Sequence, residues 1–308
     1  MKVFYAASDL QTLPLGHRFP MGKYALLRQM LRERWPQIEQ VKALPASLGE
    51  LALVHDTDYI EAVVAGTLEA SHQREIGFPW SEGMVERARA SVGATVMAAR
   101  LALVDGVSGN MAGGTHHADR RRGGGFCVFN DVAVASRLMW VEAKRRGVQR
   151  FQVAISDLDV HQGTGSAAIF HGDPRVFTLS LHGAKNFPFR KEKSDLDIEL
   201  PDGCTDGPYL RALDGALLEL DQNGPFDLVF YLAGADPHVD DRLGRLALSA
   251  DGLDKRDSRV LDWASARQIP LAFVMAGGYG PSLEHTVELQ LNTFAQAYRS
   301  WQLWPRPV

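Results

Sequence analysis

The stretch AISDLDVHQGTG, residues 154–165, decides the fold. Residues 151–155 form a mostly apolar run, which is typical of a strand that is buried on both faces of a parallel sheet. Asp157, Asp159 and His161 follow at a spacing of two, so their side chains point to one side of an extended chain. Because such groups are costly to bury without partners, the stretch predicts a buried strand that ends at a functional site.

Short apolar runs of the same kind alternate with longer amphipathic stretches along the chain. The predicted strands are residues 3–6, 151–155, 176–181, 227–232 and 271–275. The predicted helices are residues 24–35, 84–104, 130–146, 209–223, 253–268 and 283–301, and another starts near residues 56–58. This alternation favours an α/β fold with three layers, α/β/α, around a mostly parallel sheet. Because no linker, repeat or low-complexity tract interrupts it, we expect one domain over residues 1–308.

Composition and charge argue against several classes of function. The net charge is −4 and no block of five like charges occurs, so we expect neither a nucleic acid nor a membrane surface as partner. No window approaches the ~18 apolar residues of a membrane span, and the first ten residues lack a signal-peptide core. The two cysteines, Cys127 and Cys204, are too few and too far apart for a disulfide framework. We therefore expect a soluble, cytoplasmic protein.

Polar or glycine-rich segments follow the predicted strands, where open parallel sheets bind their ligands. The segments are SDLDVH (156–161), SLH (180–182), AGAD (233–236), AGGYG (276–280) and, after a short run at residues 110–111, AGGTHHADRRRGGGF (112–126). Because the carboxyl ends of parallel strands meet at one edge of the sheet, we expect these segments to converge on one site.

Asp159 and His161 can share one metal ion, because residues two apart on an extended chain point the same way. A carboxylate and an imidazole suit zinc or a similar divalent ion, and a catalytic zinc site has about three protein ligands and an open position. Asp236, at the end of the next strong strand, is the best third ligand. Asp157 either binds a hard cation or orients a histidine. Two carboxylates and one imidazole also accept Fe²⁺, so the physiological metal stays open.

Two histidines and a tyrosine are candidate catalytic groups at the same edge. His116 and His117 follow Gly113 and Gly114, which allow a sharp backbone turn. A neutral histidine can take a proton from water at a metal centre, and such a base contributes roughly 10²–10⁴-fold to the rate. Tyr279 stands between glycines after a strand, so its hydroxyl could donate a hydrogen bond to the oxyanion that forms on an amide carbonyl.

The motifs GGTHHADRRRGGGFCVFNDVAVA, DLDVHQGTG, LSLH, AGAD and AGGYG together resemble the zinc-dependent histone deacetylase family, which includes bacterial members and the acetylpolyamine amidohydrolases. The resemblance covers roughly residues 17–280, in the family's order. DLDVHQGTG, with Gln162 after the histidine, and GHRFPMGKY (16–24) look most like the class IV branch. The resemblance implies the arginase/deacetylase fold, with a parallel sheet of about eight strands between helices.

The resemblance also implies two kinds of bound cation. A catalytic zinc ion would be held by Asp159, His161 and Asp236. A structural potassium ion would contact Asp157, the carbonyls of Asp159 and His161, Ser180 and Leu181. A second monovalent site would lie near Phe170 and Val176.

Four side chains receive catalytic roles from the same resemblance. His117 would act as general base and then as general acid toward the leaving amine. His116 would be an electrostatic partner of the activated water and would be oriented by Asp157. Tyr279 would polarise the acyl carbonyl.

The family's substrate tunnel is narrow and aromatic. Phe126 matches one wall, next to Gly125, and Phe187 matches the other, although Phe189 lies close enough to fit as well. Two aromatic faces suit the methylene chain of an acyl-lysine and keep water from the amide. Leu243 stands where polyamine-selective members carry a carboxylate, which argues against a cationic polyamine as the preferred substrate.

Other positions depart from the family pattern. Thr164 stands where many members have Asp or Asn to support the second histidine. Because threonine gives weaker support, we expect His117 to be less basic than its counterpart in those members. The segment PHVDDRLGR (237–245) differs from the usual Gly-Asp-Pro pattern, so we expect this rim of the site to be reshaped. Its Asp240 and Asp241 weaken the argument against a polyamine.

We therefore expect a metal-dependent amidohydrolase that removes acetyl or other acyl groups from the lysine side chains of a protein or peptide by water attack. The main alternative is a deacetylase of acetylated polyamines or other small amines. A pure binding module has no need of the full set of ligands, bases and Tyr279. A two-metal, arginase-like enzyme needs a second carboxylate that Gln162, Gly163 and Thr164 do not supply. The acyl chain length and the oligomeric state stay open.

Overall fold

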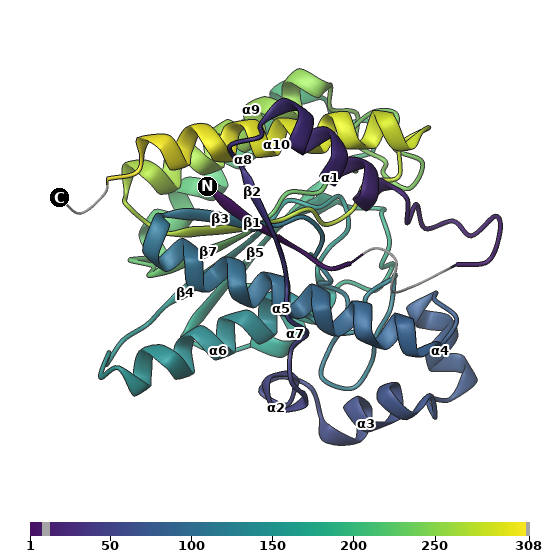
Figure 1. Ribbon diagram of the computed structural model, residues 1–308. Coiled ribbons are helices and arrows are strands. Elements are labelled where there is room, and N and C mark those ends of the chain that lie inside the picture. Colours follow the sequence, from purple (N-terminus) through teal and green to yellow (C-terminus); the bar gives the residue numbers. More distant parts are fainter. Residues whose placement is uncertain (8–12, 306–308) are drawn as a thin grey trace.

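The computed structural model describes residues 1–7 and 13–305, and in these residues an eight-stranded sheet lies between two layers of helices (Figure 1). The strands are β1 (Lys2–Tyr5), β2 (Glu39–Lys42), β3 (Val107–Asn110), β4 (Val153–Asp157), β5 (Val176–Gly183), β6 (Leu196–Leu200), β7 (Leu228–Leu232) and β8 (Leu271–Val274). Their order is β2-β1-β3-β8-β7-β4-β5-β6, and all neighbours run parallel. The predicted three-layer α/β/α fold is confirmed.

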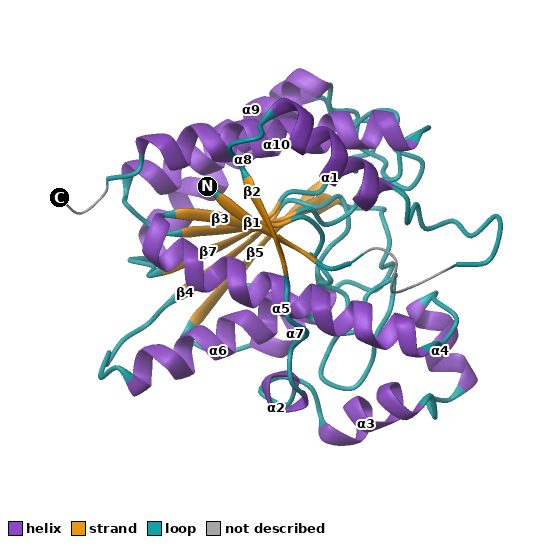
Figure 2. Ribbon diagram, in the orientation of Figure 1, coloured by secondary structure: helices purple, strands orange, loops and turns teal. Residues whose placement is uncertain are grey.

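The helices divide between the two faces of the sheet, as Figure 2 shows. One layer contains α1 (Lys23–Arg34), α8 (Asp206–Asn223), α9 (Ala250–Ala266) and α10 (Leu283–Leu303). The other contains α5 (Glu82–Asp105), α6 (Asp131–Arg145) and α7 (Thr164–Phe170). The short helices α3 (Thr57–Ala65) and α4 (Ala70–Ile76) lie toward the N-terminal end of α5, and α2 (Leu48–Leu51) contacts α6.

A hydrophobic core fills each side of the sheet, because successive residues of a strand point to opposite faces. Ile155 of β4 and Phe230 of β7 belong to the core beneath α5 and α6. Their neighbours Ala154 and Val229 belong to the core beneath α8, α9 and α10. Every residue of β4 and β7 is buried, which explains why the sequence of these strands is almost uninterrupted in its apolar character.

The outermost strands were not predicted from the sequence. β2 (EQVK) and β6 (LDIEL) are partly exposed, and neither contains an apolar run. Helices α2, α4 and α7, of four to seven residues, were also missed. The predicted central strands and long helices are all present, with ends that differ by a few residues. Cys127 and Cys204 are both buried and form no disulfide, as expected.

The carboxyl ends of the central strands meet at one edge of the sheet, and the long loops gather there (Figure 1). Asp157 is the last residue of β4, so the loop that holds Asp159 and His161 starts at this edge. Among the described residues, no helix is long and apolar enough to cross a membrane. The cytoplasmic location stays a prediction.

Candidate active site

Two neighbouring strand ends bring the expected metal ligands together. Asp159 and His161 follow β4, and Asp236 follows β7, the neighbouring strand. Their ligand atoms all lie within 4.8 Å of one another. His161 Nδ1 is 2.9 Å from Asp159 Oδ1 and 3.3 Å from Asp236 Oδ2. The structure therefore places all three predicted ligands in one buried cluster.

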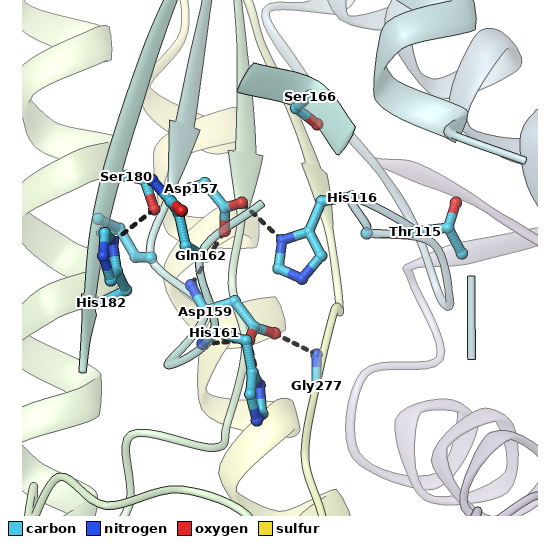
Figure 3. A network of polar contacts seen from close by, with 12 residues as sticks. Thr115, His116, Asp157, Asp159, His161, Gln162, Ser166, Ser180, His182 and Gly277 are labelled. Carbon is cyan, nitrogen blue, oxygen red and sulfur yellow. Dashed lines mark hydrogen bonds and ion pairs between the residues drawn. The ribbon is translucent and has the colours of Figure 1, made fainter. Parts of the chain in front are cut away.

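Backbone amides hold the two carboxylates of this cluster in place. Gly277, after β8, donates its N–H to Asp159 Oδ2 at 2.7 Å (Figure 3). Val160 donates its N–H to Asp236 Oδ1 at 3.0 Å. The other oxygen of that carboxylate, Oδ2, is buried and receives no well-aligned hydrogen bond from the described residues, although His161 Nδ1 lies 3.3 Å away. A buried anionic oxygen of this kind is costly unless a cation lies close to it.

The pKa shifts of the cluster reflect strong coupling between its charges. Burial and the neighbouring charge of Asp159 raise the pKa of Asp236 to about 7. Burial alone would lower the pKa of His161, but hydrogen bonds and the charges of Asp159 and Asp236 outweigh it and raise the pKa to about 10. Two carboxylates and an imidazole are donors typical of zinc and similar divalent ions. The residues present therefore fit a divalent cation, whose binding would compete with protons.

The two adjacent histidines have opposite electrostatic environments. His116 Nδ1 lies 2.6 Å from Asp157 Oδ2 (Figure 3). Burial lowers the pKa of His116, but the charge and hydrogen bond of Asp157 outweigh it and raise the pKa to about 9. The pKa of His117 is well below 6.5 because of its burial and the charges of His116 and His161. At pH 7 these shifts favour a protonated His116 and a neutral His117, so the two adjacent rings differ in charge.

His117 lacks the support that a carboxylate or amide would give it. Its Nδ1 is buried and has no hydrogen-bond partner in residues 1–7 and 13–305. Thr164 begins helix α7, and its own N–H is bonded to the carbonyl of Gln162 at 2.9 Å. The departure at Thr164 therefore coincides with an unpaired Nδ1 on the neutral histidine.

The residues expected around a potassium ion are also neighbours. Asp157 of β4 pairs in register with Ser180 of β5, and Leu181 follows it in the buried part of that strand. Ser180 Oγ lies 2.9 Å from Nδ1 of His182 (Figure 3). Phe170 ends α7 and Val176 begins β5, on the same connection. Both monovalent sites stay predictions.

A cavity of about 540 Å³ leads to the metal-ligand cluster. Its lining includes every predicted tunnel residue, together with two histidines and the tyrosine: Gly125, Phe126, Phe187, Leu243, His117, His161 and Tyr279. Phe187 lies 5.2 Å from His117 between ring centroids, whereas Phe189 is 81% exposed, so Phe187 forms the wall. A Cβ at Gly125, whose φ is +52°, would lie 2.6 Å from His117 Cδ2, so glycine is needed there.

Several residues of the site were missed from the sequence. Phe19 and Phe78 pack against Phe126, at centroid distances of 5.1 and 5.3 Å. Lys23, which is buried, donates from Nζ to the carbonyl of Gly278 at 3.2 Å and lies over the Tyr279 ring at 5.4 Å. The motif GHRFPMGKY contains Phe19 and Lys23, so it was a signal, but no spacing rule assigned these residues to the site.

Carboxylates and imidazoles that cluster at the carboxyl edge of a parallel sheet are typical of hydrolase active sites. Residues 17–294 match the histone deacetylase domain. The chain belongs to the histone deacetylase family, a family of hydrolases.

Relatives of known sequence and structure agree with this assignment. A protein of Picosynechococcus sp. without an assigned function is 46% identical over 92% of this chain and 94% of its own. Histone deacetylase 2 of Arabidopsis thaliana is 34% identical over 78% of this chain and 63% of its own. A solved HDAC homologue complexed with SAHA shares the fold, with a TM-score of 0.77 at 23% identity over 98% of this chain and 89% of that one. The class IV branch stays a prediction.

Proposed function

We propose that the chain is a metal-dependent deacylase of lysine side chains in a protein or peptide. The observation that carries this proposal is the cluster of Asp159, His161 and Asp236 at an aromatic cavity that His117 and Tyr279 also line. An acyl-lysine presents an apolar methylene chain that ends in an amide, and an aromatic passage to a polar centre suits this shape. The proposal includes one catalytic domain over residues 1–308.

The cluster would hold one divalent cation, zinc or ferrous iron. Such an ion would supply a Lewis acid that activates water and polarises the acyl carbonyl. The buried Oδ2 of Asp236, whose polar neighbour is His161 Nδ1 at 3.3 Å, and the burial of all three ligands support this assignment. A potassium ion near Asp157, Ser180 and Leu181 would be a separate, structural ion.

His117 and Tyr279 would handle the protons and charge of the hydrolysis. Neutral His117 would take a proton from the attacking water as the new C–O bond forms. It would return that proton to the lysine nitrogen as the C–N bond breaks. Burial and the charges of Asp159 and Asp236 hold the pKa of Tyr279 well above 10, so its hydroxyl would stay protonated and donate to the acyl oxygen.

His116 would contribute through its charge. The Asp157 carboxylate keeps the imidazole of His116 protonated, and the two rings of the histidine pair lie 4.2 Å apart between centroids. A fixed positive charge beside His117 would favour the anionic tetrahedral intermediate over the neutral amide. It also keeps His117 in the neutral form that a base requires.

The charges at the cavity support a lysine substrate over a polyamine. Leu243 lines the cavity, together with Arg18, Arg74 and Glu75, which carry a net positive charge. Asp241 is absent from the described lining, and its Oδ2 accepts the N–H of Tyr279 at 2.6 Å. A cationic polyamine would therefore meet two arginines and one glutamate, whose net positive charge disfavours it.

The substrate class can be tested with one peptide that carries acetyl-lysine, a longer acyl-lysine or trifluoroacetyl-lysine, beside acetylated polyamines. We expect metal-dependent release from the peptides with kcat/KM well above that for the polyamines. Leu243→Glu should lower the ratio of kcat/KM for the peptides to kcat/KM for the polyamines, because it adds a carboxylate at the cavity. The matched control is Leu303→Glu, at an exposed position in α10, which should leave this ratio unchanged. Cleavage of polyamines alone would transfer the function to small-molecule metabolism.

A further inference from the structure

A second group of metal-ligating side chains lies outside the proposed catalytic centre. His238 and Asp240 belong to the segment PHVDDRLGR after β7, and His285 lies in the first turn of α10. One donor atom from each of the three lies within 4.8 Å of the others. The proposed mechanism uses none of them.

The distances between the donor atoms approach those of a zinc site. His238 Nδ1 is 3.4 Å from His285 Nε2, and Asp240 Oδ2 is 3.7 Å from His285 Nε2 and 3.9 Å from His238 Nδ1. Two ligands of a tetrahedral zinc ion lie roughly 3.3 Å apart, since Zn–N and Zn–O bonds are about 2.0–2.1 Å long. If the three donor atoms moved together by a few tenths of an ångström, their separations would match those of zinc ligands. The cluster of Asp159, His161 and Asp236 has comparable spacings of 2.9 and 3.3 Å.

The burial of the three side chains suits an ion that enters from solvent. The His238 side chain is 7% exposed and forms the inner wall, whereas those of His285 and Asp240 are 32% and 55% exposed. The rings of the two histidines cross at 65° with centroids 4.9 Å apart, so they are not stacked face to face. Asp240 donates its N–H to His238 Nδ1 at 3.2 Å, a bond that a metal ion would replace and that water can compensate.

We propose that His238, Asp240 and His285 form a second metal site for zinc or a similar borderline divalent ion. Two imidazoles and one carboxylate favour such ions over Mg²⁺ and Ca²⁺, which prefer oxygen ligands. The positive end of the α10 dipole opposes a cation, but the charge of Asp240 and of Glu284 in the first turn offsets this effect. Three protein ligands leave a position for water.

An ion at this position would tie together the two loops that frame Tyr279. Asp241, next to Asp240, accepts the N–H of Tyr279, and Arg242 donates from Nε to the Tyr279 carbonyl at 3.0 Å. His285 follows Tyr279 by six residues, across the start of α10. Occupancy of the second site would therefore hold the segment that carries the proposed carbonyl donor.

The test measures zinc bound to the full chain by equilibrium dialysis and elemental analysis. We expect about two equivalents for the wild type and about one for His285→Asn or Asp240→Asn, both of which change partly exposed side chains. Asp159→Asn should also bind about one, and Asp159→Asn combined with His285→Asn close to none. His72→Asn, in helix α4, is the matched control and should keep both equivalents.

Each result separates the second site from the catalytic centre. Unchanged zinc content in both His285→Asn and Asp240→Asn would overturn the second site and leave the proposed function untouched. The wild type could instead bind one equivalent of zinc that Asp240→Asn loses and Asp159→Asn keeps. That result would overturn the catalytic centre and support the second site. If Asp159→Asn fails to fold, the comparison of wild type, Asp240→Asn and His72→Asn still decides the second site.

Discussion

The substitution Gly277→Ala tests how closely the backbone of the β8 loop approaches the two metal-binding carboxylates. A Cβ at this position would lie 1.8 Å from Asp236 Oδ2 and 2.7 Å from Asp159 Oδ2. The Asp236 carboxylate cannot move away freely, because its other oxygen accepts the N–H of Val160 at 3.0 Å. To restore a separation of 3.0 Å, its Oδ2 must retreat by about 1.2 Å, whereas a metal bond tolerates about 0.2 Å.

We therefore expect Gly277→Ala to lose one ligand of the cluster. Altered support of a ligand alone weakens metal binding by about 10- to 100-fold, so the loss of a ligand should cost at least about 100-fold in zinc affinity. The assay is zinc competition with a chromogenic chelator, together with deacylation of an acetyl-lysine peptide. Activity at limiting zinc should decline in parallel with affinity.

The control is Gly215→Ala, which adds the same methyl group inside helix α8 with nothing within 4 Å. It should leave zinc affinity unchanged and stabilise the chain by about 1 kcal/mol, since alanine is the better helix former. A Gly277→Ala variant whose zinc affinity and turnover both lie within a few-fold of the wild-type values would refute the proposed ligand positions.

Three further predictions follow from the same geometry. Tyr279→Phe should keep zinc and KM but lower kcat by roughly 10²–10³, and a rate within a few-fold of wild type would exclude Tyr279 as carbonyl donor. His117→Ala should retain zinc and lower kcat by roughly 10²–10⁴, and an unimpaired kcat would remove it as the base. Burial lowers the pKa of His55 to about 4, so the unfolded chain, with a pKa near 6.5, takes up the proton first as the pH falls. The contribution of neutral His55 to the free energy of unfolding is complete above pH 6.5 and is lost as the pH falls toward 4. Between pH 7 and pH 5, the free energy of unfolding in urea should therefore fall by about 2 kcal/mol more for wild type than for His55→Asn. Equal decreases would contradict the assignment.

The central strands and the metal ligands could be predicted because both depend on local patterns. β4 and β7 are buried on both faces, so their sequences are mostly apolar, and the polar residues stand where the parallel strands end. Asp159 and His161 share a direction through their spacing of two. The third ligand, Asp236, required only the assumption that its strand lies beside β4, which the register confirms.

Residues whose positions depend on packing between distant segments could not be predicted. Phe19 reaches Phe126, and Lys23 reaches Gly278, through the way α1 and its preceding loop lie over the sheet edge. The second histidine pair is separated by 47 residues, and no spacing signal links His238 to His285. The short edge strands β2 and β6 lack an apolar run because each is covered on fewer sides.

The most direct test of the central claim is the turnover of an acetyl-lysine peptide by one protein sample that is chelated and then reloaded with zinc. The proposed mechanism predicts that free acetate and free lysine side chain appear in equal amounts, that chelation abolishes the reaction, and that about one equivalent of zinc at the catalytic centre restores it. Asp236→Asn should stay inactive after reloading, because it removes the charge that the cluster needs. Full turnover by chelated protein, or by reloaded Asp236→Asn, would contradict the claim.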